Sequence, residues 1–104
     1  MQSDVITGTV AAEGKIPQRF TLYRNFPNPF NPATTIKFTL PEASNVTLKI
    51  YNILGEEVVT LVSDWLTAGL YTYRWNAGNL ASGIYLCQLR TNDDVETRKM
   101  MLMR

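Results

Sequence analysis

Gly83-Ile84-Tyr85-Leu86-Cys87-Gln88-Leu89-Arg90-Thr91 is the stretch that decides the fold of this chain. Apolar side chains occupy both of its alternating sets, and only Gln88 and Arg90 near its end are strongly polar. Such a run is typical of a strand that is buried on both faces. Turn-forming residues bound it on each side, Ser82-Gly83 before and Asn92-Asp93-Asp94 after, so it is too short to favour a helix. The sequence therefore predicts a central strand over residues 83–91.

The rest of the chain supplies neighbours for this strand. Short segments of alternating apolar and polar residues recur about every dozen residues, with turn signals between them and no helical periodicity. This pattern predicts an all-β fold, an immunoglobulin-like antiparallel β-sandwich of about seven strands. Besides the central strand, the expected strands are Phe20–Tyr23, Thr34–Leu40, Val46–Tyr51, Glu57–Val62, Leu70–Asn76 and Val95–Arg104.

Two connections carry clear signals. Asn52–Glu56 is expected to form a hairpin turn, with Gly55 at the position that needs a positive φ. Asp64–Gly69 is expected to be a loop.

A proline-rich segment precedes the second expected strand. Phe26-Pro27-Asn28-Pro29-Phe30-Asn31-Pro32 cannot form a helix, and its prolines lack the N–H groups that a sheet requires. We expect a stiff, extended crossover whose Phe26 and Phe30 side chains plug one end of the core. The alternative is a proline-rich docking peptide, but too few prolines follow one another for a polyproline ligand.

The length of 104 residues is enough for one compact domain with its own core. Met1–Asp4 resembles an added start on the C-terminal piece of a longer protein. Asp4–Lys15 contains two glycines and mostly small residues, which predicts a linker with a candidate edge strand within Val5–Val10. We therefore expect a linker over residues 1–19 and a folded domain over residues 20–104.

The composition excludes several classes of function. A net charge of +1 gives no reason to expect nucleic acid or an anionic membrane as a partner, and no apolar run is long enough for a membrane span. The chain has no histidine, so the usual metal spacings and catalytic triads cannot be assembled. Its single cysteine, Cys87, is expected to be buried and inert. The sequence predicts a protein that is not an enzyme, with no cofactor, metal or small-molecule substrate.

An aromatic row admits two interpretations. Tyr71, Tyr73 and Trp75 share one face of an expected strand, and Trp65 precedes them. The rings either stack on sugars or lie in the core, and the core is favoured because large aromatics dominate small sandwich cores.

Five blocks of sequence, in this order, carry a resemblance to a known family. The combination is similar to the type A C-terminal sorting domain of the type IX secretion system, from about Phe20 to the last residue. The blocks are Phe26–Pro32, Val46–Glu56, Ala68-Gly69 leading to Trp75, Leu80–Tyr85, and Lys99–Arg104. The positions that match the family motifs are Pro27, Asn28, Pro29, Phe30, Tyr51, Asn52, Leu54, Gly55, Gly69, Trp75, Gly83 and Tyr85.

The resemblance implies a secretion signal fused to the C-terminus of a passenger protein. It implies that the passenger is carried from the periplasm to the outer-membrane surface or the medium, and that the partners are the outer-membrane translocon and a cell-surface sortase. Cleavage would fall in or just after residues 4–15. The residues expected to be recognised by the translocon are Lys99, Met100, Met101, Leu102, Met103 and Arg104.

The last strand is apolar on both faces, and this favours a free edge. A partner could extend such an edge by strand addition, and isolated copies could pair through it. Two other classes of protein remain as alternatives. One is an accessory carbohydrate-binding module of a secreted hydrolase, and the other is a structural immunoglobulin-like spacer that resembles the domain of flagellar hook-capping proteins.

Overall fold

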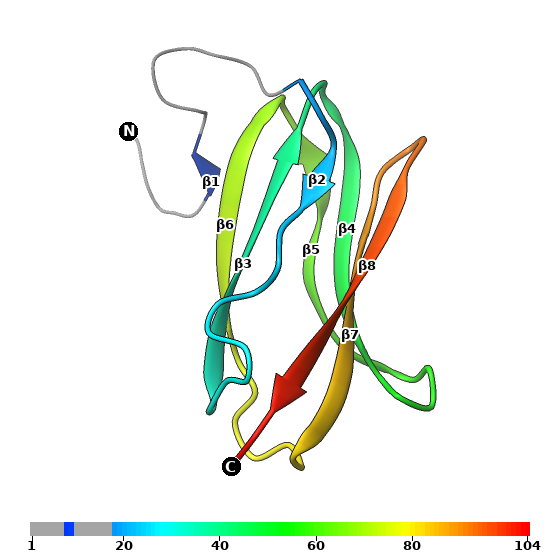
Figure 1. The fold of residues 1–104 in the computed structure, drawn as a ribbon. Helices are drawn as coiled ribbons and strands as arrows, with labels where there is room; N and C mark the ends of the chain where they lie inside the picture. Colours follow the sequence, from blue (N-terminus) through cyan, green and yellow to red (C-terminus); the bar gives the residue numbers. More distant parts are fainter. Residues whose placement is uncertain (1–7, 10–17) are drawn as a thin grey trace.

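The computed structural model describes residues 8–9 and 18–104, and it consists of two antiparallel sheets packed face to face (Figure 1). The first sheet has the strand order β1-β6-β3-β2, and the second has the order β5-β4-β7-β8. No helix occurs in the described residues, and so none there could cross a membrane. The strands are β1 (Gly8–Thr9), β2 (Thr21–Leu22), β3 (Ala33–Leu40), β4 (Ser44–Asn52), β5 (Glu57–Leu66), β6 (Gly69–Asn76), β7 (Gly83–Arg90) and β8 (Val95–Leu102).

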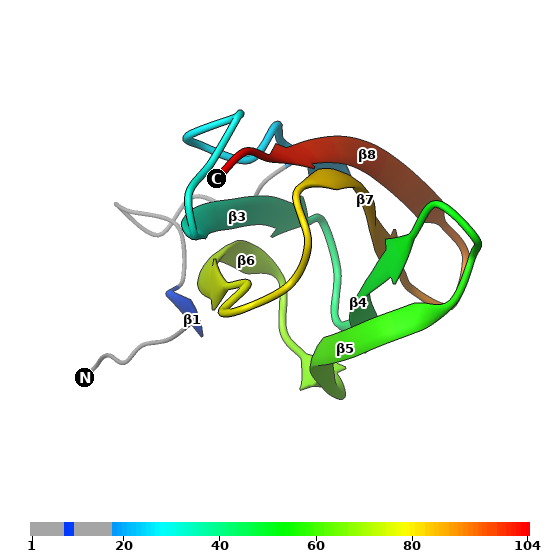
Figure 2. The same ribbon diagram turned by 90° about the horizontal axis from the view of Figure 1, so that it is seen from below.

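The chain changes sheet at three connections, from β3 to β4, from β5 to β6 and from β6 to β7. Seen along the strands, the two sheets form the two layers of a sandwich (Figure 2). This arrangement confirms the predicted all-β antiparallel sandwich. The described chain enters at the end of the sandwich opposite to the one where Arg104 lies (Figure 1).

The core fills with the inward set of each alternating strand, as the sequence predicts. Ile36, Phe38 and Leu40 of β3 face Val46, Leu48 and Ile50 of β4, and all six are buried. Aromatic rings join the two sheets at one end of this core, where Trp75 of β6 lies 5.6 Å from Phe30 and 6.0 Å from Tyr85 of β7 between ring centroids. Ring pairs at these spacings stabilise a fold beyond the area that they bury.

The strand β7 is central in its sheet, between β4 and β8, but it is buried on one face only. Tyr85, Cys87 and Leu89 lie in the core, whereas Ile84 and Leu86 are half-exposed. The expectation of burial on both faces was therefore wrong. No further layer of the described chain covers the outer face of this sheet, so apolar residues there remain in contact with solvent.

The strand β5 is longer than predicted, and the loop expected over Asp64–Gly69 is confined to residues 67–68, so its predicted bounds were wrong. β5 continues to Leu66, with Trp65 paired to Asn45 of β4. Two register shifts in the β4–β5 pairing leave Val58 and Leu61 as extra residues on β5. Both bulges lie within the predicted part of the strand. The part that was missed pairs with β4 without a register shift, but it begins with Ser63 and Asp64, which are typical of turns and so indicated a loop.

A tyrosine at the start of each of β6 and β7 anchors the preceding loop. The hydroxyl of Tyr71 donates a hydrogen bond of 2.8 Å to the carbonyl of Thr67, and that of Tyr85 donates one of 2.7 Å to the carbonyl of Ala81. Both bonds run back four residues, in the manner of the tyrosine corner of immunoglobulin-like sandwiches. Each bond satisfies a buried phenol and fixes the entry of its strand.

Only one of the two phenylalanines of the proline segment reaches the core. Phe30 is buried, but Phe26 is 79% exposed, so the expectation that Phe26 plugs the core was wrong. The backbone of Phe26 pairs with that of Thr35, whose side chain is on the outward set of β3. Directly paired residues share a face of a sheet, so the Phe26 ring is turned outward. The segment is an extended crossover as predicted, and the peptide bonds before Pro27, Pro29 and Pro32 are cis.

The edge strand proposed within Val5–Val10 is present at Gly8–Thr9, which pairs with Leu70 and Tyr71 of β6. The rest of the expected linker, up to residue 17, lies outside the described residues.

Candidate functional site

The six C-terminal residues divide into two that build the core and four that face solvent. Met100 and Leu102 are buried, because they lie on the core-facing side of β8, where Met100 is paired with the core residue Tyr85 of β7. Lys99 and Arg104 are exposed, Met101 is 37% exposed and Met103 is 57% exposed. Only these four side chains are available to a partner. The buried pair maintains the strand that presents them.

β8 is the last strand of its sheet, and the proline segment covers part of its free edge. Phe30 donates a main-chain hydrogen bond of 2.9 Å to the carbonyl of Met101 and accepts one of 3.0 Å from the N–H of Met103. The side-chain oxygen of Asn28 accepts a bond of 3.0 Å from the N–H of Met101. The expectation of an uncovered last strand was therefore wrong over residues 101–103. Both views show the β2–β3 connection beside the end of β8 (Figures 1 and 2).

A second contact holds the opposite end of the β8 edge. Glu96 Oε1 accepts a hydrogen bond of 2.6 Å from the N–H of Leu22, and Arg98 Nε donates one of 2.9 Å to the carbonyl of the same residue. Leu22 lies in β2, the edge strand of the other sheet. These two side chains therefore join the sheets along one open side of the sandwich, and inward charges of this kind also discourage unwanted pairing of edge strands.

The final residue is fixed although its side chain is exposed. The N–H of Arg104 donates a hydrogen bond of 3.0 Å to Ser82 Oγ, and its Nε donates one of 2.8 Å to the carbonyl of Leu80. Both partners belong to the loop before β7. The C-terminus is thus held against a segment about twenty residues earlier in the chain.

Most of the motif positions support the fold. Phe30, Trp75 and Tyr85 are core residues, and Gly69 and Gly83 begin β6 and β7. Asn28 and Phe30 make the contacts that cover the edge of β8, and Pro27 and Pro29 flank Asn28 in the chain. The structure does not gather these twelve positions into one pocket.

Among the family-motif positions, those in the hairpin between β4 and β5 include an apolar side chain that is exposed to solvent. Asn52 Oδ1 accepts hydrogen bonds of 2.9 Å from the N–H of Leu54 and 3.0 Å from the N–H of Glu56, and Gly55 has a φ of +83°. This confirms the predicted hairpin and the position of Gly55. Leu54 is 78% exposed at its tip, while Tyr51 is half-buried at the end of β4. Leu54 therefore contributes little to the core.

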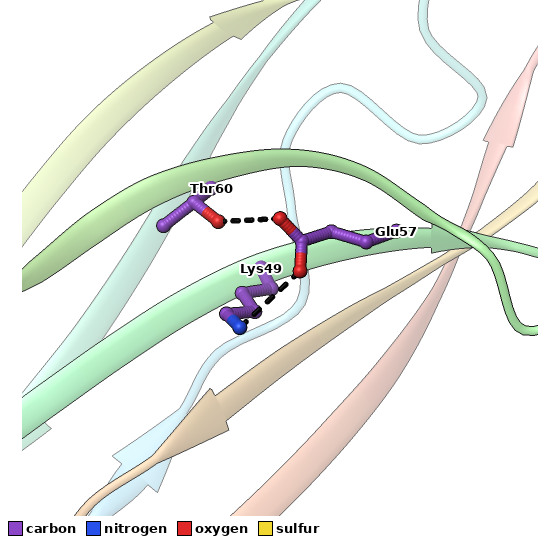
Figure 3. A network of polar contacts seen from close by, with 3 residues as sticks. All are labelled: Lys49, Glu57 and Thr60. Atoms are coloured by element: carbon purple, nitrogen blue, oxygen red, sulfur yellow. Dashed lines mark hydrogen bonds and ion pairs between the residues drawn. The ribbon is translucent and has the colours of Figure 1, made fainter.

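The cationic side chains at the end of β8 form no ion pair with another described residue. In the described part of the chain the one ion pair joins Lys49 Nζ and Glu57 Oε1 at 3.2 Å, on the opposite side of the same sheet (Figure 3). The hydroxyl of Thr60 bonds the other carboxylate oxygen of Glu57 at 2.8 Å. The Thr60 hydrogen bond, followed by the Lys49 bond, lowers the pKa of Glu57 below its ordinary value. Lys99, Arg98 and Arg104 have no carboxylate within 4 Å among residues 18–104.

Cys87 offers no reactive thiol. It is buried in β7, and burial raises its pKa to about 12, so the thiolate is suppressed at neutral pH. The expectation of a buried cysteine is confirmed. Within the described residues no group of three or more acidic, histidine or cysteine side chains is placed to bind a metal ion.

The aromatic row does not form a sugar-binding platform. Tyr71 and Trp75 are buried, and Tyr73 is half-buried with its ring 5.9 Å from that of Phe38. Burial also raises the pKa of the Tyr73 phenol. Trp65 is 56% exposed, but it lies on the other sheet. The core interpretation is confirmed for Tyr71 and Trp75, and the rings cannot act together on a ligand.

Sequence reasoning missed the contacts that hold the edges of β8. One signal was available in each case. Glu96 and Arg98 are two charges in one alternating set of the last strand, and charges within such a strand are a known form of edge protection. Asn28 lies between two prolines, where its amide is free to bond outside its own segment.

The fold and the site define a class of protein: a small β-sandwich without assembled catalytic groups in its described part, whose last strand is fixed at its edge and displays a few terminal side chains. The family model for the secretion system C-terminal sorting domain matches residues 24–103. The chain therefore belongs to the C-terminal sorting domain family of the type IX secretion system. No curated protein matches the chain.

Family membership gives the general function. The chain is a C-terminal sorting signal of type IX secretion. Such a signal implies attachment to a passenger protein, interaction with the type IX machinery, and export through the periplasm to the outer-membrane surface or the extracellular space.

Proposed function

We propose that residues 20–104 form the sorting domain and that the outer-membrane translocon recognises the exposed terminal side chains of this domain. The observation that carries the proposal is the display of Lys99, Met101, Met103 and Arg104 on a strand that is held at its edge and at its end. Met100 and Leu102 act indirectly, because they hold β8 on the core.

The position of the passenger is compatible with recognition at this end. The described chain enters the sandwich at the end opposite to Arg104 (Figure 1). The passenger therefore attaches to the end of the sandwich that does not carry the terminal side chains.

The second part of the proposal concerns removal of the domain. After the passenger crosses the outer membrane, a cell-surface sortase cuts in or just after residues 4–15. The passenger is then released or stays at the surface. Mass spectrometry of the processed passenger measures the position of the cut.

The test is a secretion assay in a host with a type IX system. A fluorescent protein with a periplasmic export signal is fused to the N-terminus of this chain and followed by cell fractionation. Deleting all six terminal residues would be a poor test, because it removes Met100 and Leu102 from the core. The informative variants are the double charge reversal Lys99→Glu/Arg104→Glu and the deletion of residues 103–104.

The matched control is Lys37→Glu/Arg74→Glu, which reverses two exposed charges on β3 and β6 of the other sheet. We expect the control and the unmodified chain to deliver a shortened reporter to the surface or medium, and both test variants to leave it in the periplasm although circular dichroism shows a folded domain. Equal delivery by the test variants would reject recognition of the terminal residues. An uncleaved periplasmic reporter with the unmodified, folded chain would reject the sorting function itself.

A further inference from the structure

A groove runs along the edge of β8 between the proline segment and the contact with Leu22. It has a volume of about 440 Å³ and separates Thr97–Met101 from the segment that carries Arg24, Asn28 and Pro29. The contact of Asn28 with Met101 lies at one end of this groove, and the contact of Arg98 with Leu22 lies near the other. Thr97–Met101 of β8 line the groove, which is the length of a short strand segment.

The main chain of β8 presents unused hydrogen-bonding groups in this groove. The N–H and C=O of Met101 point away from β7, since they bond Asn28 and Phe30. In an antiparallel strand, residues two apart direct their main-chain groups to the same side. The corresponding groups of Lys99 and Thr97 therefore point into the groove. In the described part of the chain these four groups have no hydrogen-bond partner on that side.

The groove is positively charged. Arg24, Arg98 and Lys99 line it, and no aspartate or glutamate does. The nearby carboxylate of Glu96 already accepts the N–H of Leu22, and none of the three cations has an acid within 4 Å among residues 18–104. Peptide segments that add to a sheet edge gain affinity from main-chain bonds and specificity from side-chain contacts. The charges here select acidic side chains.

We propose that this groove binds an extended, acidic peptide segment of a partner protein, which adds as a short strand beside Thr97 and Lys99. The proposal rests on the proposed function, because it states the chemistry of a partner that approaches the last strand of a sorting domain. A second copy of this chain does not fit: its β8 edge would bring Arg24, Arg98 and Lys99 against the same three cations. We therefore expect this edge to bind a partner of opposite charge and not a second copy of the chain.

The first experiment uses the full 104-residue chain and a fluorescein-labelled eight-residue peptide of alternating glutamate and valine. Fluorescence anisotropy measures its affinity, beside a peptide of alternating lysine and valine. We expect the acidic peptide to bind at least tenfold more tightly, and its binding to weaken as salt is added. An acidic peptide with N-methyl groups on alternate amides, which cannot form strand hydrogen bonds, should bind at least tenfold more weakly than the unmethylated one.

Two pairs of variants place the binding in the groove. Arg24→Glu should weaken the acidic peptide at least tenfold, whereas Arg74→Glu, an equal charge change on the outer face of the other sheet, should change it less than twofold. Thr97→Pro removes an N–H that points away from β7, a position where an edge strand tolerates proline. It should abolish binding while Thr97→Ala retains it, and thermal melting checks that each variant is folded.

Four results would overturn the proposal: equal binding of acidic and basic peptides, equal effects of Arg24→Glu and Arg74→Glu, unchanged binding of the N-methylated peptide, or a dimer in sedimentation equilibrium that Thr97→Pro dissociates. The secretion assay separates this proposal from the sorting function. Normal delivery by Arg24→Glu, with peptide binding lost, would reject only the groove as a site for the machinery. Normal delivery by Lys99→Glu/Arg104→Glu would reject recognition of the terminal side chains, whatever the peptide does.

Discussion

The side-chain oxygen of Asn28 lies 3.0 Å from the main-chain nitrogen of Met101 and accepts its hydrogen bond across 73 positions of sequence. With the two main-chain bonds of Phe30, this contact makes the proline segment the cover of the last strand. Three prolines leave few main-chain donors in the segment, so it supports the edge of β8 without continuing the sheet. The first and last motif blocks of the family are thus one structural unit.

The terminal residues differ in their contributions to stability. Met100→Ala should lower the free energy of unfolding by about 2 to 5 kcal/mol, because it leaves a cavity in a closed core. Met101→Ala, next in sequence but exposed, should change it by no more than about 0.5 kcal/mol. Urea unfolding followed by tryptophan fluorescence measures both. Similar losses for the two variants would show that β8 is not seated as described.

The Asn28 contact should be visible in both stability and exchange. Asn28→Ala removes the acceptor for the Met101 N–H and should cost about 1 kcal/mol of unfolding free energy. Hydrogen exchange of the Met101 amide should become faster in the same variant. Asn28→Asp keeps an oxygen acceptor and should retain slow exchange. If the two variants exchange alike, the amide of Met101 is protected by something other than this side chain.

The two tyrosine hydroxyls should each stabilise the fold. Tyr85→Phe removes one hydrogen bond to a carbonyl four residues earlier, at an expected cost of about 1 kcal/mol. Tyr71→Phe removes the equivalent bond and also the 3.2 Å bond with the Thr67 hydroxyl, so its cost should be at least as large. Tyr51→Phe is the matched control, since no hydrogen bond of its hydroxyl is formed in the described structure. Chemical denaturation compares the three. A loss at Tyr51 equal to the others would mean that the hydroxyl bonds add nothing specific.

Cys87 should react only when the domain unfolds. Iodoacetamide at pH 8 should label it slowly in the native protein and rapidly in urea, because the thiol is buried and its pKa is raised to about 12. A raised pKa in the folded state means that stability is fully present below the unfolded pKa of about 8.5 and declines as the pH rises above it, by up to about 1.4 kcal/mol per pH unit. Cys87→Ala should lack this part of the alkaline decline. Rapid labelling of the native protein would contradict the burial.

The sequence predicted the structure correctly where a short local pattern of residues is enough to determine it. Ile36, Phe38 and Leu40 showed their inward face by alternation, and Asn52 with Gly55 showed the hairpin by turn chemistry. The sequence was misleading where the structure depends on what packs against a strand and not on the strand's own residues. The apolar outer set of β7 looked buried although no layer of the described chain covers it. The turn-type residues Ser63 and Asp64 concealed the continuation of β5 to Leu66.

The surroundings of the terminal strand could be predicted only in part. The sequence indicated that Lys99–Arg104 forms a strand with two apolar sets, but it could not tell which set faces the core, because methionines occupy both. It also could not reveal that Asn28, Phe30 and Leu22 meet β8, since those contacts depend on how the two sheets are packed. Phe26 was misplaced for the same reason: its direction follows from its pairing with Thr35.

The hydrogen bonds from Arg104 to Ser82 and Leu80 fix the position of the last residue through contacts that are distant in sequence. A receptor that binds Arg104 in this place recognises a conformational epitope and not a linear tail. An unfolded copy of the chain carries the same final residues but presents no such epitope. Under our proposal, recognition therefore also tests folding, because a passenger whose terminal domain has misfolded presents no binding surface to the translocon.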